Sequence, residues 1–539
     1  MKKLFFLFLL ALIVPNIALV FTESQNALTG LCNILLPLAV YWRILSIFRN
    51  PGKAIWVAFP FVFLAAFQIV LLYLFGRAII GVDMFLNLVT TNSDEVSELL
   101  GNLLPAVIGV FVIYIPFLIL GIVGIHRKWK LPLKFLLLQR KLSIYALACL
   151  LPLTGVYRIA SPSFRFSNDV FPINVCYNLV LAINRSHDMA NYPEKSKSFQ
   201  FKAVSTRPDS LREIYVLVIG ETARARNFQL YGYSRPTNPL LIHTKGLITF
   251  TSAMSQSNTT HKSVPMLLSA ATAENYDCIY QQKGILSAFR EAGFKTGFFS
   301  NQRRNHAFID IFGMEAETWK FIKDGKPTDK NVYDEELLPY VKQILKKKYK
   351  KLFIVLHTYG SHFNYRERYP KDFAYFLPDA PTEAKASNRP TLVNAYDNSI
   401  RYTDHLLSRL IAMLNAERAH SAILYTSDHG EDIFDDEREL FLHASPVPSL
   451  NQLQVPLLVW LSDDYRKAYP NIALQLEKNK QKPVATSRSV FHSLLKIGGI
   501  KTPLYCPEFT PADPSYKVLP YHYLTDRNQP ISLQDMNIE

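Results

Sequence analysis

Five stretches without a charged side chain lie within the first 157 residues, and they constrain the fold more than any other feature of this 539-residue chain. These stretches are residues 4–21, 27–42, 54–76, 99–125 and 142–157. A helix needs about 20 apolar residues to cross the hydrocarbon core of a bilayer. The pattern therefore predicts an N-terminal transmembrane domain of five helices over residues 1–157.

The distribution of basic residues predicts the orientation of these helices. Residues 1–157 hold 12 Lys/Arg and 5 Asp/Glu, and the basic residues concentrate at the N-terminus and in segments 43–53 and 127–141. Because positively charged loops stay on the cytoplasmic side, the N-terminus is expected inside and everything after residue 157 outside. The net charge of +15 partly reflects this asymmetry, so we predict no nucleic-acid partner. The outer loop 77–100 is either an amphipathic helix at the membrane surface or an ordinary packed loop.

The remainder of the chain has the pattern of an α/β domain. A proline-containing linker is predicted over residues 158–205, and a regular alternation follows within 206–539. Short apolar runs at 215–220, 295–300, 352–357 and 422–427 alternate with helical patterns at 285–292, 334–346 and 393–414. Buried strands that alternate with helices predict a mostly parallel sheet flanked by helices.

Polar side chains follow the predicted strands directly. Glu221 follows the first strand, His357 ends the third with His362 five residues later, and Asp428 and His429 follow the fourth. His443 lies in a polar loop further on. Ligands of such sheets collect beyond the carboxyl ends of the strands, and carboxylates with imidazoles suit zinc, or manganese as an alternative. The sequence contains no CxxC or HExxH pattern, which excludes a zinc finger of that kind and a zincin.

A hydroxyl nucleophile is predicted in the segment QSNTTHKSVPMLL (256–268), which has the pattern of a polar loop entering a helix. A hydroxyl at the first turn of a helix lies near free N–H groups, which favour a phosphate. A metal would lower the pKa of such a hydroxyl and so permit attack at neutral pH. The candidates are Ser257, Thr259, Thr260 and Ser263, and composition does not choose among them.

Several of these segments together resemble a known family. The run GETARARNFQLYGYSRPTNPLL is similar to the signature of bacterial phosphoethanolamine transferases, which belong to the alkaline phosphatase and sulfatase superfamily and include the enzymes of mobile polymyxin resistance. Further similarity lies in THKSVP, VLHTYGSH, YDNSIRYTD, TSDHGE and TTNSDEVSELL. The segments concerned are residues 220–241, 260–265, 355–362, 396–404, 426–431 and 90–100.

The resemblance implies roles for individual residues and for ligands. It implies an alkaline phosphatase-like catalytic domain, one or two zinc ions, phosphatidylethanolamine as donor, and lipid A or another envelope glycolipid as acceptor. It also implies a multi-pass protein of the bacterial inner membrane with a periplasmic catalytic domain. The implied residues are Glu221, Thr260, Asp428 and His429 as metal ligands with Thr260 as nucleophile, His362 and His443 at a second metal or phosphate position, His357 on the substrate side, and Asn301 and Gln302 near the donor head group. We also predict that His357 is catalytic, as the acid that protonates the leaving alkoxide.

Other activities use the same chemistry and stay open as alternatives. A phosphoglycerol transferase, a phosphatase or phosphodiesterase, and a membrane-anchored sensor without catalysis are each compatible with a threonine–metal core. The chain also departs from the family, because only Cys176, Cys278 and Cys506 lie after residue 157 and three thiols allow at most one intrachain disulfide. Sulfatases mature a Cys or Ser within a CxPxR-like motif. No cysteine lies within 251–277, which disfavours sulfatase activity.

Overall fold

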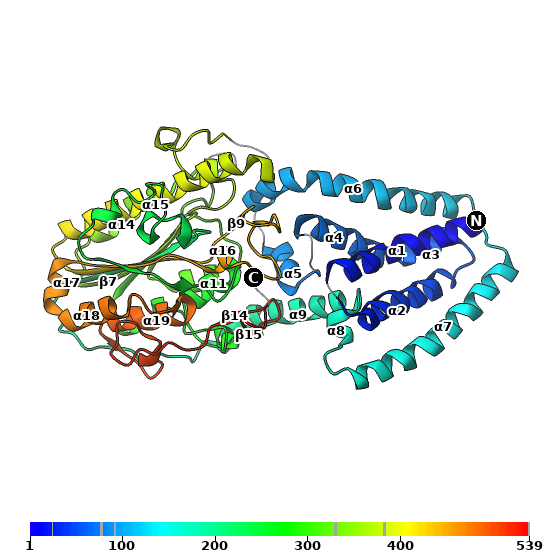
Figure 1. Ribbon diagram of the computed structural model, residues 1–539. Helices are drawn as coiled ribbons and strands as arrows, with labels where there is room; N and C mark the ends of the chain where they lie inside the picture. The colour runs from blue at the N-terminus through cyan, green and yellow to red at the C-terminus, as the bar shows by residue number, and fades with distance from the viewer. Residues whose placement is uncertain (24, 76–78, 91–92, 328–330, 381–383, 537–539) are drawn as a thin grey trace. The chain divides into compact units, whose positions relative to one another are not determined.

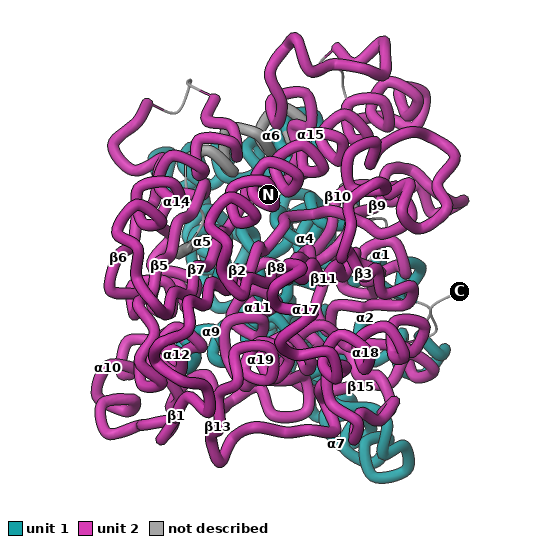
Figure 2. The backbone as a smooth tube through the Cα atoms, turned by 90° about the vertical axis from the view of Figure 1, so that its left-hand side faces the viewer, with its two compact units in different colours: residues 1–89, 99–185 teal, residues 90–98, 186–539 magenta. Residues whose placement is uncertain are grey.

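The computed structural model describes residues 1–23, 25–75, 79–90, 93–327, 331–380 and 384–536 (Figure 1). Two compact units are distinguished. The first comprises Met1–Val89 and Leu99–Arg185, and the second comprises Thr90–Glu98 and Ser186–Glu539 (Figure 2).

The first unit is helical, and its helices follow the predicted apolar stretches. Four described helices are long and apolar enough to span a bilayer, and α3 with α4 would make a fifth span that bends by 61°. The last span begins earlier than predicted, so the helix continues through its charged N-terminal residues. The helices are α1 (Lys2–Thr22), α2 (Ala27–Leu45), α3 (Pro51–Val57), α4 (Phe59–Phe75), α5 (Val82–Thr90), α6 (Ser93–His126), α7 (Leu133–Ala160), α8 (Phe166–Asp169) and α9 (Ile173–Ala190).

Buried polar side chains join the helices of this unit. Asn16 of α1 donates from Nδ2 to the carbonyl oxygens of Asn33 and Phe171, each over 2.7 Å. Trp42 Nε1 of α2 donates to Gln139 Oε1 of α7 over 3.0 Å. Such bonds stabilise helix association where apolar surroundings offer no other partner.

Two segments of this unit lie largely outside the predicted apolar stretches. Within 77–100, α5 is a helix whose Val82 and Phe85 are buried against Leu19, Leu71 and other helix residues, so its apolar face packs on neighbouring helices. Residues 77–78 and 91–92 lie outside the described residues. The segment 158–205, predicted as a linker, contains the 18-residue helix α9, which has an apolar stripe to bury. The first compact unit extends to Arg185, within α9.

The second unit is built on a seven-stranded sheet with the order β3-β11-β8-β2-β7-β5-β6, a row that can be followed in Figure 2. The pairs β2–β7, β2–β8, β5–β7 and β5–β6 are parallel, whereas β11 is antiparallel to both β8 and β3. A mostly parallel α/β sheet is thus confirmed. The strands are β2 (Glu213–Gly220), β3 (Leu247–Phe250), β5 (Lys295–Ser300), β6 (Thr318–Phe321), β7 (Lys351–His357), β8 (His420–Ser427) and β11 (Leu457–Leu461).

Both faces of the sheet are covered, which explains the uninterrupted apolar strands. Along β2, Ile214, Val216 and Val218 enter one hydrophobic cluster, while Leu217 and Ile219 enter the other. In Figures 1 and 2 helices α14 and α15 lie on one face, and α11, α12, α18 and α19 on the other. Their bounds are α11 (Thr260–Leu267), α12 (Ile285–Glu291), α14 (Leu338–Leu345), α15 (Arg389–Ala416), α18 (Pro470–Asn479) and α19 (Thr486–Ile497).

Smaller elements complete the unit. They are helices α10 (Tyr192–Lys195), α13 (Phe308–Gly313), α16 (Leu450–Leu453) and α17 (Asp463–Ala468), and strands β1 (Val204–Ser205), β4 (Ala253–Met254), β9 (Asp432–Ile433), β10 (Phe441–Leu442), β12 (Val484–Ala485), β13 (Ile500–Lys501), β14 (His522–Leu524) and β15 (Pro530–Ser532).

The register brings the carboxyl ends of the central strands to one edge. Gly220 of β2 pairs with Ser427 of β8, and Ile219 pairs with His357 of β7. The residues that follow β2 and β8 therefore leave the sheet side by side, which is where a ligand site of this architecture is expected.

Candidate metal centre and nucleophile

Glu221, Asp428 and His429 form a buried group at this edge. One ligand-type atom from each lies within 4.8 Å of the others, and all three residues are fully buried. Glu221 follows β2 directly, and the other two follow β8. The pairing of these strands therefore brings together side chains that are about 200 residues apart in the sequence.

The hydrogen bonds of this group leave acceptor atoms facing one another. Nδ1 of His429 lies 2.9 Å from the carbonyl oxygen of Gly430, so Nδ1 carries the proton and the Nε2 lone pair is available. Nε2 lies 3.4 Å from Glu221 Oε1 and 3.2 Å from Asp428 Oδ2. Asp428 Oδ2 is buried and has no hydrogen-bond donor among the described residues. Two carboxylates and an imidazole lone pair that converge in this way fit a divalent metal such as zinc.

Burial determines the electrostatics of the same group. Desolvation and the neighbouring Glu221 carboxylate raise the pKa of Asp428 well above its ordinary value. Desolvation and the nearby His443 lower the pKa of His429 well below its ordinary value. Each shift is the usual response of a buried group that lacks a compensating charge. A bound cation would supply that charge to the carboxylates.

Thr260 places its hydroxyl on this group. It is the first residue of α11, and its Oγ1 lies 3.2 Å from Glu221 Oε1 and 3.1 Å from His429 Nε2. The other candidate hydroxyls are engaged within their own segment: Ser257 Oγ lies 3.1 Å from Thr259 Oγ1, and Ser263 Oγ donates to the Thr259 carbonyl over 2.9 Å. Of the four hydroxyls left open by the sequence, the geometry favours Thr260.

Further donors hold the two carboxylates in place. Gln302 Nε2 donates to Glu221 Oε2 over 2.9 Å, and Thr222 Oγ1 donates to Oε1 over 2.9 Å. The backbone N–H groups of Thr222 and His429 both donate to Asp428 Oδ1, over 3.1 and 2.8 Å. Such outer bonds fix the orientation of metal ligands.

His443 and His362 lie beside this group. The ring centroid of His443 is 4.2 Å from that of His429, and the ring of His362 is 6.0 Å from that of His443. Burial and the nearby His362 lower the pKa of His443 to about 4. Glu431 joins them with Oε1 at 3.7 Å from His443 Nδ1, and sequence reasoning gave this residue no role. Glu431 could have been found from the sequence, because it is the last residue of the run TSDHGE (426–431).

His357 and Asn301, two of the residues predicted on the substrate side, are both buried. His357 is buried, its Nδ1 lies 3.1 Å from Ser300 Oγ, and burial lowers its pKa to about 3. A neutral imidazole at physiological pH does not favour the role of acid. Asn301 is also buried and donates to the Val332 carbonyl and to Asp334 Oδ1 over 3.0 and 2.8 Å. Gln302 is thus the member of the predicted pair that contacts the metal group.

The C-terminal segment contacts the loop that carries Thr260, which the sequence did not indicate. Leu524 N of β14 donates to the Gln256 carbonyl over 2.7 Å, and Tyr523 Oη donates to Asn258 Oδ1 over 2.6 Å. The buried Lys262 donates from Nζ to the carbonyl oxygen of Thr525 over 2.8 Å. The hairpin β14–β15 therefore supports the nucleophile loop.

Comparison with known proteins places this architecture. A family model described as Sulfatase matches residues 213–500, which is more than half of the chain. The chain belongs to this family. The superfamily indicated by the sequence motifs is thereby confirmed.

Several of the curated relatives that the chain matches are named phosphoethanolamine transferases. It is 32% identical over 302 residues to phosphoethanolamine transferase EptA of Escherichia coli (strain K12), with 54% of each chain covered. It is 30% identical over 297 residues to Kdo(2)-lipid A phosphoethanolamine 7''-transferase of the same organism, with 52% of this chain and 50% of the relative covered. The chain thus spans about half the length of the curated relatives it matches.

A solved structure matches nearly the whole chain. The integral membrane protein lipooligosaccharide phosphoethanolamine transferase A (EptA) from Neisseria meningitidis aligns with a TM-score of 0.72 and 23% identity, covering 94% of this chain and 97% of the other. The fold of an apolar helical N-terminal part followed by a sulfatase-like α/β part is therefore shared.

Proposed function

We propose that the protein transfers phosphoethanolamine from phosphatidylethanolamine to lipid A or another envelope glycolipid through a phospho-threonine at Thr260. The observation that carries the proposal is the contact of the Thr260 hydroxyl with Glu221 and His429, in a chain with relatives that are named phosphoethanolamine transferases. The first unit would anchor the protein in the bacterial inner membrane with its N-terminus in the cytoplasm. The second unit would work in the periplasm.

Glu221, Asp428 and His429 would hold one zinc ion, with Thr260 as a further ligand. When bound, zinc would lower the pKa of the threonine hydroxyl and offset the negative charge of the phosphoryl oxygens. His362 and His443 would donate hydrogen bonds to these oxygens or hold a second ion. Their position beside His429 supports this assignment.

The transfer would proceed in two displacements at phosphorus. In the first, Thr260 Oγ forms a bond to the phosphorus of phosphatidylethanolamine, and the bond from phosphorus to the diacylglycerol oxygen breaks. The threonine hydroxyl loses a proton in this step, and the diacylglycerol oxygen gains one. Diacylglycerol therefore leaves as the alcohol. In the second, an acceptor oxygen forms a bond to the same phosphorus and the bond from phosphorus to Thr260 Oγ breaks. Oγ takes up a proton from the acceptor or from solvent, which restores the threonine hydroxyl. One nucleophile that serves both steps gives ping-pong kinetics.

Mass spectrometry of envelope lipids tests the proposal in cells that produce the wild type, Thr260→Ala or Ser263→Ala. Ser263 is a matched control because it lies about one turn along the same helix and its Oγ donates to the Thr259 carbonyl. We expect phosphoethanolamine on lipid A and an increase in diacylglycerol with the wild type and the control, and neither with Thr260→Ala. Diacylglycerol without a lipid A adduct would replace the acceptor by water or another glycan.

Phosphoglycerol transferred in place of phosphoethanolamine would overturn the donor assignment. An unchanged lipid profile with the wild type would favour the sensor alternative, because the metal-type residues would then serve no transfer.

A further inference from the structure

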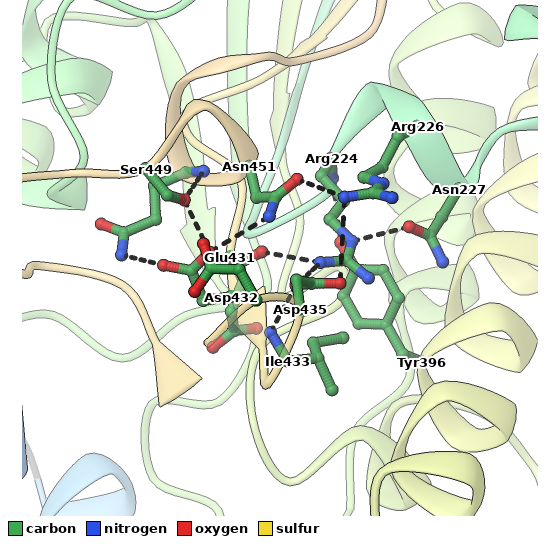
Figure 3. A network of polar contacts seen from close by, with 12 residues as sticks. Arg224, Arg226, Asn227, Tyr396, Glu431, Asp432, Ile433, Asp435, Ser449 and Asn451 are labelled. Atoms are coloured by element: carbon green, nitrogen blue, oxygen red, sulfur yellow. Dashed lines mark hydrogen bonds and ion pairs between the residues drawn. The ribbon is translucent and has the colours of Figure 1, made fainter. Parts of the chain in front are cut away.

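Arg224 links the loop that carries Glu221 to the segment that carries Asp428 and His429, the three residues called the metal-type residues below. It lies in the loop after β2, on the same stretch as Glu221, and its side chain is 2% exposed. Its Nη1 donates over 3.1 Å to the carbonyl oxygen of Glu431, in the loop after β8, and also forms an ion pair with Asp435, just beyond the short strand β9 that follows this loop (Figure 3). Nε donates to Asn227 Oδ1 over 2.6 Å. One guanidinium thus bonds to both loops.

The backbone of the loop after β2 is fixed at the same place. Tyr396 of α15 accepts a hydrogen bond from Arg224 N over 2.9 Å and donates one to the Thr222 carbonyl over 2.7 Å. Its ring centroid lies 5.3 Å from the Arg224 guanidinium carbon. Thr222 has a φ of 61°, in the left-handed region that a threonine rarely adopts. Such a conformation persists only where surrounding contacts hold it.

Hydrogen bonds from its own segment and from Arg389 fix the side chain of Asp435. Its side chain is 3% exposed, Oδ2 accepts from Ile433 N over 2.9 Å, and Oδ1 accepts from Arg389 Nη2 over 2.9 Å. Figure 3 shows Arg224 and Asp435 pointing toward each other between the two loops. A buried ion pair of this kind adds little to stability compared with an apolar pair.

The strand pairing alone does not fix the metal-type residues. The ladder between β2 and β8 ends at Gly220 and Ser427, immediately before Glu221 and Asp428. Beyond that point Thr222 N donates to Asp428 Oδ1 and Ala223 N donates to Ser427 Oγ, and the Arg224 contacts join the two segments once more after the ligand-type residues. Each loop is thus attached at both ends of its ligand-bearing segment.

We propose that the buried Arg224–Asp435 pair is a positioning element that sets the separation between Glu221 and the Asp428–His429 pair for metal binding. The inference rests on the metal centre of the proposed function, not on the identity of donor or acceptor. Metal ligands must be held within about 0.5 Å of their working geometry, and their outer partners change metal affinity 10–100-fold. Neither residue needs to contact the metal or the substrate.

The test measures metal binding by the full-length chain in detergent, with Arg224→Lys, Asp435→Asn and the double variant. Lysine keeps the charge but cannot reproduce the fork geometry of arginine. Arg226→Gln is the matched control, because Arg226 lies on the same loop and its Nη1 is 3.9 Å from the same Asp435, but its side chain is 55% exposed. Zinc affinity is determined by competition with a chelator, and the visible spectrum of the cobalt(II)-loaded protein reports ligand geometry.

We expect each single variant to bind zinc about 10–100-fold more weakly and to change the cobalt spectrum. The double variant should be no weaker than the weaker single variant, because the two residues act as one pair. The control should remain within about twofold of the wild type, as expected for an exposed site. Folded single variants with wild-type affinity and spectrum would overturn the inference.

Two further outcomes are distinguished by design. If the single variants do not fold, the pair Arg224→Met with Asp435→Leu replaces the ion pair by apolar packing, a change that is often neutral for stability. This folded protein should still bind zinc weakly, and wild-type affinity in it would refute the inference. If the wild type itself binds neither zinc nor cobalt, the metal centre of the proposed function fails instead.

Discussion

Replacing Glu221 by glutamine should change the stability of the protein in opposite directions with and without zinc. Without metal, Glu221 and Asp428 are buried carboxylates whose oxygens lie within 4.8 Å of each other. At this separation and an effective dielectric constant of about 20, the repulsion between two charges is about 3.5 kcal/mol. Glutamine removes this repulsion. Its amide nitrogen then faces Gln302 Nε2, and this donor without an acceptor lowers the free energy of unfolding by about 1 kcal/mol. The metal-free variant should therefore be about 2 kcal/mol more stable.

With zinc the sign reverses. A metal that binds only the folded protein stabilises it by about 4 kcal/mol at a concentration 1,000 times its dissociation constant. An amide in place of a carboxylate ligand removes the charge attraction on which this binding depends, so Glu221→Gln loses most of the gain. The wild type should then be the more stable protein.

Thermal unfolding of the full-length chain at pH 8, in EDTA and in saturating zinc, measures both signs. Glu274→Gln is the control, because Glu274 pairs with Arg488 and His522 and lies outside the metal group. It should lower the melting temperature equally in both conditions. If Glu221→Gln also lowers the melting temperature in EDTA and adds no further loss in zinc, Glu221 is a structural acceptor and the metal assignment is refuted.

Three further changes test the surroundings of the site. Tyr523→Phe leaves Asn258 Oδ1 without its donor, which should lower the free energy of unfolding by about 1–3 kcal/mol and lower transfer activity. An unchanged free energy of unfolding would contradict the role of the C-terminal hairpin. Gln302→Met frees Glu221 Oε2 and should weaken zinc binding about tenfold in a chelator competition, whereas unaltered affinity would remove Gln302 from the site. Burial raises the pKa of Asp404 to about 6, so its contribution to stability is full below about pH 4 and falls by about 3 kcal/mol as pH rises through 6. Asp404→Asn should remove this loss, so that the melting-temperature difference between variant and wild type grows from pH 4 to pH 8; a constant difference would contradict the shift.

The sequence by itself determined the elements and the edge at which the site lies. Apolar stretches and strand–helix alternation depend on neighbouring residues, so the apolar centres of the long helices of the first unit could be located, and strands β2, β5, β7 and β8 were predictable within a few residues. Glu221, Asp428 and His429 could be grouped in advance because the carboxyl ends of parallel strands meet at one edge. The motif GETAR with TSDHGE added the superfamily.

Only the tertiary structure decided which side chains touch. Arg224 and Asp435 are 211 positions apart, and Tyr523 is 265 positions from Asn258, so no local pattern announces either contact. The same holds for His357 and for α9, whose surroundings depend on segments distant in the sequence. Periodicity reports which face of an element is buried, but register and packing between distant segments select its partners. The ligand types were therefore a property of the sequence, whereas the geometry that holds them was a property of the fold.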